Sequence, residues 1–219
     1  MAWLQRAIPA AIICGAGLAV NANAATITVN NIGDGSVAGQ CTLRDAIDAA
    51  NTNGAVSGCA AGSAGADTIA FSLPSNSVIT MGNNSFDYWI TESVTIDGAG
   101  APGLVIEGNR NNRTKRIFRA DTGNVAQGMA LSIKNITLRN AALGAGEPTT
   151  LGGGAIYGKA LQSLTINNVV IDGTDAAAGA GGCISVHDTP TVTLTFTSLQ
   201  NCTARDGAGL SVRNPNAPT

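Results

Sequence analysis

The strongest constraint on the fold of this chain is an internal repeat of short apolar strands. Four triplets that are apolar at their outer positions recur along the chain, at Val94–Ile96, Leu131–Ile133, Leu164–Ile166 and Val192–Leu194. Each of the last three triplets is followed, five residues after its final residue, by one apolar position of a second set. The second set is Ile106, Leu138, Ile171 and Leu199, and a third set is Phe118, Ile156, Ile184 and Leu210. Repeats of this length bury their apolar faces only against neighbouring copies, which favours stacked coils.

The spacing between the sets predicts an all-β fold, a single-stranded parallel β-helix. Ten residues lead from Ile156 to Ile166 and again from Ile184 to Leu194, whereas the join from the second set to the third varies in length. Three strands per coil, stacked about 4.8 Å apart, satisfy this pattern. An antiparallel sandwich is the alternative, and it predicts frequent hairpin turns rather than a three-column register. The 28 glycines, which follow no collagen period, agree with a turn-rich β protein.

Two asparagines mark the predicted corner between the first and second strands of a coil. Asn135 and Asn168 occupy equivalent positions in successive repeats. Asparagine tolerates the left-handed conformation and bonds its own backbone, so it suits a tight corner. Stacked coils would let these side chains form an amide ladder. The four Asp-Gly pairs, at residues 34, 97, 172 and 206, are interpreted as turn signals in the same way.

One amphipathic helix is predicted over residues 42–51. Thr42 can cap it with Asp45 at the third helical position, and Asn51 with Gly54 can end it. Its apolar face consists of Leu43, Ala46, Ile47 and Ala50. We expect this face to cover the open end of the first coil, because an uncovered edge invites pairing with other chains. A helix buried elsewhere or lying on the surface is the alternative. The first coil is predicted to contain three successive strands, at Ile27 and Val29, Ile69 and Phe71, and Val78 and Ile79.

The first 24 residues have the pattern of a secretory signal peptide. Arg6 precedes an apolar run from Ala7 to Val20, and Ala22-Asn23-Ala24 supplies a small-x-small cleavage site before Ala25. A lipid anchor on Cys14 is a minor alternative, since Ile13 stands where such a site requires a small residue. Residues 25–91 are predicted to form the N-terminal cap region with the first coil, and residues 92–219 the remaining coils. No segment is long and uncharged enough to predict a transmembrane helix.

Export leaves four cysteines in an oxidising compartment, which predicts two disulfides. Three pairings are open, and we favour sequence neighbours, Cys41 with Cys59 and Cys183 with Cys202; free buried thiols are the alternative. No zinc motif is present, and no metal or other cofactor is predicted. Removing Arg6 from the 12 basic residues leaves 11 against 14 acidic ones, so the charge gives no indication of a nucleic-acid partner.

Four segments carry a resemblance to a known family. The strings ATITVNN, CTLRDAIDAANTN, GADTIAF and ESVTIDGAG resemble, in this order, the CSLREA-type N-terminal region of bacterial surface proteins. The resemblance covers nearly the whole mature chain. It implies right-handed β-helix repeats of the polymorphic outer-membrane-protein and autotransporter-passenger kind, in proteins secreted or displayed at the bacterial outer-membrane surface. Because such relatives often continue into further repeats and an anchor, we expect this chain to be C-terminally truncated.

The sequence gives weak support to an enzyme. Polysaccharide lyases and glycosidases of the pectate-lyase-like class share the predicted architecture, and Glu107 and Asp172, with Arg139 between them, could form a carboxylate pair about two coils apart. A solvated ladder of alternating charge is the simpler interpretation. His187 beside Asp188 is interpreted as a surface histidine, because no serine-containing elbow accompanies it. We therefore predict no catalytic residues and a non-enzymatic, adhesin-like scaffold, with the lyase or glycosidase as the alternative.

A basic cluster is the best candidate for binding. Five basic residues fall between positions 110 and 119, in a join of variable length. Binding residues concentrate on such loops because the scaffold holds their ends rigidly. Arg119, Tyr157, Ser185 and Ser211 are predicted to point outward along the third column. The predicted binding residues are Arg113, Arg116, Arg119, Arg139 and Tyr157, and the predicted partner is an acidic polysaccharide or another ligand at a host or cell surface.

Overall fold

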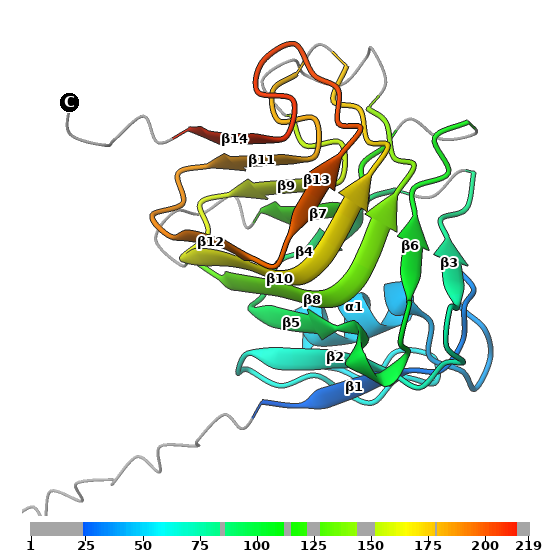
Figure 1. Cartoon of the computed structure of the whole chain (residues 1–219). Coiled ribbons are helices and arrows are strands. Elements are labelled where there is room, and N and C mark those ends of the chain that lie inside the picture. The colour runs from blue at the N-terminus through cyan, green and yellow to red at the C-terminus, as the bar shows by residue number, and fades with distance from the viewer. Residues whose placement is uncertain are drawn as a thin grey trace, which may run out of the picture.

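The computed structural model of the chain describes residues 24–83, 86–111, 115–121, 128–143, 152–177 and 179–213. These residues form a parallel β-helix with one short α-helix, α1 (Leu43–Thr52), near the N-terminal end (Figure 1). The alternating apolar strands therefore fold as predicted, and every strand pair between named strands is parallel. The antiparallel sandwich is excluded.

The strands form three columns that belong to two sheets. The first column is β1 (Thr26–Val29), β2 (Asp67–Phe71), β5 (Val94–Asp97), β8 (Ala130–Arg139), β10 (Ser163–Asp172) and β12 (Val192–Thr195). The second is β3 (Val78–Thr80), β6 (Val105–Glu107), the later halves of β8 and β10, and β13 (Ser198–Gln200). Because β8 and β10 run through the corner, these columns form one nine-stranded sheet. The third column is a separate five-stranded sheet of β4 (Tyr88–Ile90), β7 (Phe118–Asp121), β9 (Ile156–Lys159), β11 (Ile184–His187) and β14 (Leu210–Arg213).

The predicted register is confirmed in all three columns. Ile96 pairs with Ile133, Ile133 with Ile166, and Ile166 with Leu194. Each member of the second set aligns with the next in the same way, as does each member of the third. The inward side chains are buried in one continuous core, except in the last described coil, where Leu194, Leu199 and Leu210 are only partly buried.

The corner between the first and second columns has the predicted asparagine ladder. Asn135 and Asn168 have φ of 58° and 52°, in the left-handed region. Asn168 Nδ2 donates to Asn135 Oδ1 at 2.9 Å, and Asn135 Nδ2 donates to Asp97 Oδ1 at 2.7 Å. Phe196 takes the equivalent position in the next coil with φ of 49° and is 87% exposed, so an aromatic ring replaces the amide there.

The predicted composition of the first coil is wrong. Ile27 and Ile69 were expected in successive strands of one coil, but β1 and β2 lie side by side in the first column, with Ile27 aligned to Ile69. The chain between them contains α1 instead of second- and third-column strands. The sequence also gave no prediction for β4, whose Tyr88 and Ile90 begin the third column and are both buried.

The helix is confirmed as a cover for the N-terminal end. Thr42 is its N-cap, with its side chain accepting from the Asp45 amide, and Asn53 ends it in the left-handed conformation. The predicted apolar face is buried, and α1 packs against β1, β2 and β4. In Figure 1 the helix lies at the end of the solenoid where the chain begins. The alternatives of a helix elsewhere or on the surface are excluded.

Both predicted disulfides are present. Cys41 bonds to Cys59, and Cys183 bonds to Cys202. The first closes a loop around α1, and the second joins the variable loops of two neighbouring coils. The variable loops of three successive coils also stack on one another. Ala142 forms a parallel bridge to Asp175, and Asp175 forms one to Thr203. The described parts of the variable loops therefore line up along one side, as the repeat predicts.

Candidate binding site on the five-stranded sheet

The outer face of the five-stranded sheet gathers aromatic and basic side chains in two rows. Because alternate residues of a strand point to opposite faces, the residues between the core positions of each strand share this face. In strand order from β4 to β14, the first row is Trp89, Arg119, Tyr157, Ser185 and Ser211. The second row, beginning on β7, is Asp121, Lys159, His187 and Arg213.

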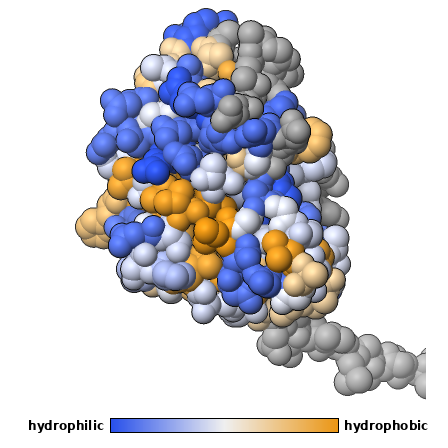
Figure 2. All heavy atoms as spheres, turned by 90° about the vertical axis from the view of Figure 1, so that its right-hand side faces the viewer, coloured by the Kyte–Doolittle hydropathy of each residue, from blue (hydrophilic) through white to orange (hydrophobic). Residues whose placement is uncertain are grey.

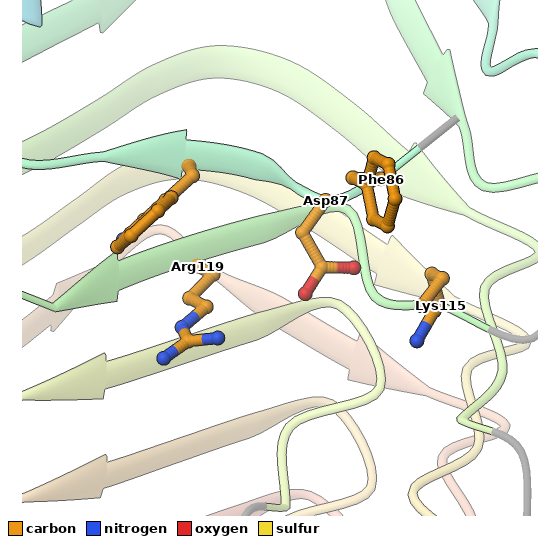
Figure 3. A pocket seen from close by; sticks show the side chains of 5 residues that line it. Phe86, Asp87, Lys115 and Arg119 are labelled. Atoms are coloured by element: carbon orange, nitrogen blue, oxygen red, sulfur yellow. The ribbon is translucent and has the colours of Figure 1, made fainter.

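A hollow lies at the N-terminal end of this face. Its volume is about 400 Å³, and it is lined by Phe86, Asp87, Trp89, Lys115 and Arg119. Figure 3 shows the Asp87 carboxylate between the basic side chains of Lys115 and Arg119. Phe86 is 78% exposed and Trp89 is 54% exposed. Large aromatic side chains are usually buried, so two exposed ones beside the same hollow favour a binding surface.

Trp89 and Arg119 are held in place by one neighbour, Asp121. Arg119 Nη2 lies 3.3 Å from Asp121 Oδ2, and the Trp89 Nε1–H donates to the Asp121 carbonyl oxygen at 3.1 Å. The guanidinium of Arg119 also lies 5.3 Å from the centre of the Trp89 ring. A cation–π contact and two polar contacts thus fix the orientation of both side chains before any ligand binds.

Two of the predicted binding residues, Arg116 and Tyr157, are buried. Each is 1% exposed. Arg116 Nη1 lies 3.1 Å from Asp87 Oδ2, and its guanidinium lies 5.1 Å from the centre of the Tyr157 ring. The expectation that Tyr157 is available at the surface is therefore wrong. Tyr157 does point away from the solenoid interior, but in this structure Arg116 and Tyr157 support the hollow rather than line it.

Burial raises the pKa of the Tyr157 phenol to about 12, and the nearby Asp121 carboxylate acts in the same direction. The phenol oxygen is buried and has no hydrogen-bond partner among the described residues. A buried polar group without a partner lowers stability.

We expect Tyr157→Phe to stabilise the protein by about 1 kcal/mol, because it removes an unpartnered hydroxyl and keeps the ring. Chemical denaturation of the two proteins measures the difference. A loss of more than about 1 kcal/mol would show that the hydroxyl has a partner in solution.

Arg139 lies on a different face from the hollow. It projects from the second column of the nine-stranded sheet, where its Nε lies 3.3 Å from Glu107 Oε1. Asn140 Nδ2 donates to the same oxygen at 2.7 Å. Figure 2 views the side of the molecule on which β3 and β6 lie, where hydrophilic side chains border an apolar area. Arg139 therefore belongs to the charge ladder that includes Glu107, and it lies apart from Arg119. Arg113, the remaining predicted binding residue, lies outside the described residues.

The Glu107 environment does not suit a general acid. The hydrogen bond from Asn140 lowers the pKa of Glu107 more than burial raises it, and Arg139 adds to the lowering. A glycosidase acid instead needs a raised pKa. Asp172, the second carboxylate considered, accepts from Asn201 Nδ2 at 2.7 Å. Both contacts fit the solvated ladder predicted as the simpler interpretation.

His187 contacts a serine that the sequence analysis did not connect to it. Ser185 Oγ lies 3.2 Å from His187 Nε2, because residues two apart in β11 share one face. Ser185 is fully buried. Burial lowers the pKa of His187, and Arg213 acts in the same direction. A buried hydroxyl cannot reach a polymeric substrate, so this pair does not form a nucleophilic site.

The sequence analysis missed Phe86 and Trp89, the aromatic part of the hollow. The alternation in Tyr88-Trp89-Ile90 could have revealed a strand with Trp89 facing outward. Trp89 precedes the first complete triplet of the repeat, Val94–Ile96, so the repeat pattern does not include it.

Comparison with known proteins gives no relative: no protein-family model, no curated protein and no solved structure matches this chain. Within the described ranges, His, Cys, Asp and Glu side chains nowhere gather in a group of three or more that could hold a metal ion. Among the same residues, no helix has the length and hydropathy needed to cross a membrane.

Proposed function

We propose that this chain is an exported, non-enzymatic β-helix scaffold that works outside the cytoplasm, as a secreted or surface-displayed, adhesin-like protein. The two disulfides support this, since such bonds persist in oxidising compartments. The leader-like pattern of residues 1–24 and the resemblance to CSLREA-type surface proteins point the same way. Residues 1–23 lie outside the described residues, so the leader remains a prediction from sequence.

The ligand that best fits the hollow is an acidic polysaccharide. An exposed tryptophan ring offers a flat apolar surface on which the apolar face of a sugar ring can stack. A guanidinium binds a carboxylate by charge-assisted hydrogen bonds, and the Arg119 side chain is 36% exposed. The single observation that carries the proposal is this exposed Trp89 held beside Arg119 at a hollow of about 400 Å³.

A polysaccharide lyase or glycosidase of the same architecture is the second candidate. It would need acids and bases that converge on one face. The carboxylates considered from sequence, Glu107 and Asp172, instead accept from asparagine amides of the charge ladder. The geometry of the described residues therefore favours binding over catalysis.

The binding proposal is tested with a panel of uronate-containing and sulfated polysaccharides. We expect Trp89→Ala and Arg119→Ala each to weaken binding about tenfold or more, as loss of one charge-assisted contact or one stacked ring does. Arg139→Ala is the matched control, since it removes one exposed arginine from another face. Titration calorimetry measures each affinity, and thermal melting verifies that each variant is folded.

Two outcomes would contradict the proposed site. One is an Arg139→Ala variant that loses as much affinity as Arg119→Ala, which would assign binding to general positive charge. The other is affinity that does not fall as salt concentration rises, since the contact between Arg119 and a carboxylate should be screened. Release of unsaturated or reducing ends from any of the polysaccharides would favour the enzyme instead.

A further inference from the structure

A buried carboxylate lies at the start of β2. Asp67 is 1% exposed. Its Oδ1 accepts from Ser63 Oγ at 2.6 Å, and its Oδ2 accepts from the Ser63 amide at 3.0 Å. The third donor is the Ala25 amide, 2.9 Å from Oδ1. No lysine or arginine among the described residues forms an ion pair with it.

Of the three other carboxylates of low exposure, two are each paired with an arginine, and Asp45 accepts hydrogen bonds from the hydroxyls of Ser36 and Thr42. Asp34 lies 2.8 Å from Arg44, and Asp121 lies 3.3 Å from Arg119. Burying a carboxylate without a counter-charge is costly, and proteins usually avoid it by pairing or by protonation. Among the described residues, Asp67, like Asp45, is held by hydrogen bonds alone, so a positive charge on one of its donors would strengthen its binding.

One of the three donors to Asp67 is the nitrogen at the predicted leader boundary. Ala25 N lies 2.9 Å from Asp67 Oδ1 and 3.1 Å from Ser63 Oγ. On the other side, the Gly62 backbone closes over the carboxylate: a Cβ there would lie 2.6 Å from Asp67 Oδ2 and 2.6 Å from the Ala49 carbonyl oxygen. Ala24 is exposed, whereas Ala25 is half-buried. The carboxylate thus faces the position where removal of the leader would create an amino terminus.

We propose that the α-ammonium group of Ala25, formed when the leader is removed, is the cation bound by Asp67. The inference rests on the proposed export. An export peptidase uses water to break the Ala24–Ala25 C–N bond; the hydroxyl goes to the Ala24 carbonyl carbon and a hydrogen to the Ala25 nitrogen. That nitrogen then takes up a further proton as the new Ala24 acid releases one. The resulting ammonium already has two acceptors in place, Asp67 Oδ1 and Ser63 Oγ.

This contact would make the stability of the fold depend on processing. The Ala25 carbonyl oxygen accepts from the Thr68 amide at 2.8 Å, directly before β1 pairs with β2. An ion pair at this point would fix the first strand of the solenoid to the second. In a chain cut elsewhere or not cut, the same nitrogen is an uncharged amide and the strand pair lacks the electrostatic contribution.

The test compares the exported protein with a variant that carries one glycine inserted between Ala24 and Ala25. Cleavage after Ala24 then leaves the glycine as the first residue, so Ala25 keeps an N–H for the hydrogen bond but loses the charge. Mass spectrometry of the purified proteins gives their first residues. We expect the insertion to lower Tm by about 5 °C or more, as loss of a buried ion pair would in a domain of this size.

Asp67→Asn separates the ion pair from other effects of the insertion. In that background the glycine should change Tm by about 1 °C or less, because independent changes add and changes to one pair do not. The pH dependence has a defined sign. The unfolded α-amino pKa is about 8 and pairing raises it, so the stabilisation is present below about pH 8 and is lost as pH rises through the higher folded value.

Three results would overturn the inference. Equal loss of Tm from the insertion in both backgrounds would show that Asp67 is not the partner. A pH-independent difference between the two N-termini would show that no ammonium is involved. An exported chain whose first residue is not Ala25 would remove the proposed cation, and a chain that is never exported would instead contradict the proposed function.

Discussion

Replacing Ile47 by aspartate should destabilise the protein by several kcal/mol or prevent folding. Ile47 is 2% exposed and lies on the face of α1 that covers the N-terminal end of the core. A carboxylate at this position would be buried in an apolar seam with no partner, which is among the most costly single substitutions known. Urea denaturation followed by far-UV circular dichroism measures the effect, and loss of soluble protein is its extreme form.

The neighbouring residue provides the control. Asp48 is exposed on the outer side of the same helix, so Asp48→Lys should change stability by about half a kcal/mol or less. Both substitutions change the charge of one helical residue, but only the side chain of residue 47 points into the core. Similar losses in the two variants would mean that α1 does not cover the core in solution.

Asp34→Ala should cost about 3 kcal/mol, because Asp34 joins three parts of the N-terminal region. Its carboxylate lies 2.8 Å from Arg44 on α1 and accepts from the Tyr88 hydroxyl on β4 at 2.7 Å. It also accepts from the Gly82 amide at 2.7 Å. Its side chain is 5% exposed, so water cannot replace the lost acceptor easily.

Asp206→Ala is the matched control for Asp34→Ala, because both residues begin an Asp-Gly turn. The Asp206 side chain is 57% exposed, and its ion pair is with Arg205, which is 59% exposed. Exposed pairs of this kind contribute little, so we expect a change within about half a kcal/mol. If thermal and urea denaturation give equal losses for the two variants, Asp34 does not act as the junction described above.

The sequence alone determined the repeat, and through it the register. Inward residues such as Ile133 and Ile166 recur at fixed offsets because stacked coils must place like residues in line, and a slip of one residue would turn the apolar set outward. Asn135 and Asn168 were predictable for a related reason, since few residues adopt the left-handed corner at low cost. The cap of α1 followed from Thr42 and the spacing of its apolar face.

Only the tertiary structure decided how non-repeating segments meet. Asp34 looks like Asp206 in sequence, and nothing local shows that the first is enclosed by Arg44 and Tyr88. The Tyr157 side chain points outward, as the alternation along the strand predicts. Its burial depends on neighbours such as Arg116, which precedes the neighbouring strand β7. The placement of Trp89 beside Arg119 likewise required the pairing of β4 with β7. Stacking of the coils determines the contacts between equivalent positions of a repeat. Contacts between non-equivalent residues depend instead on the path of each loop, and the period of the repeat does not determine that path.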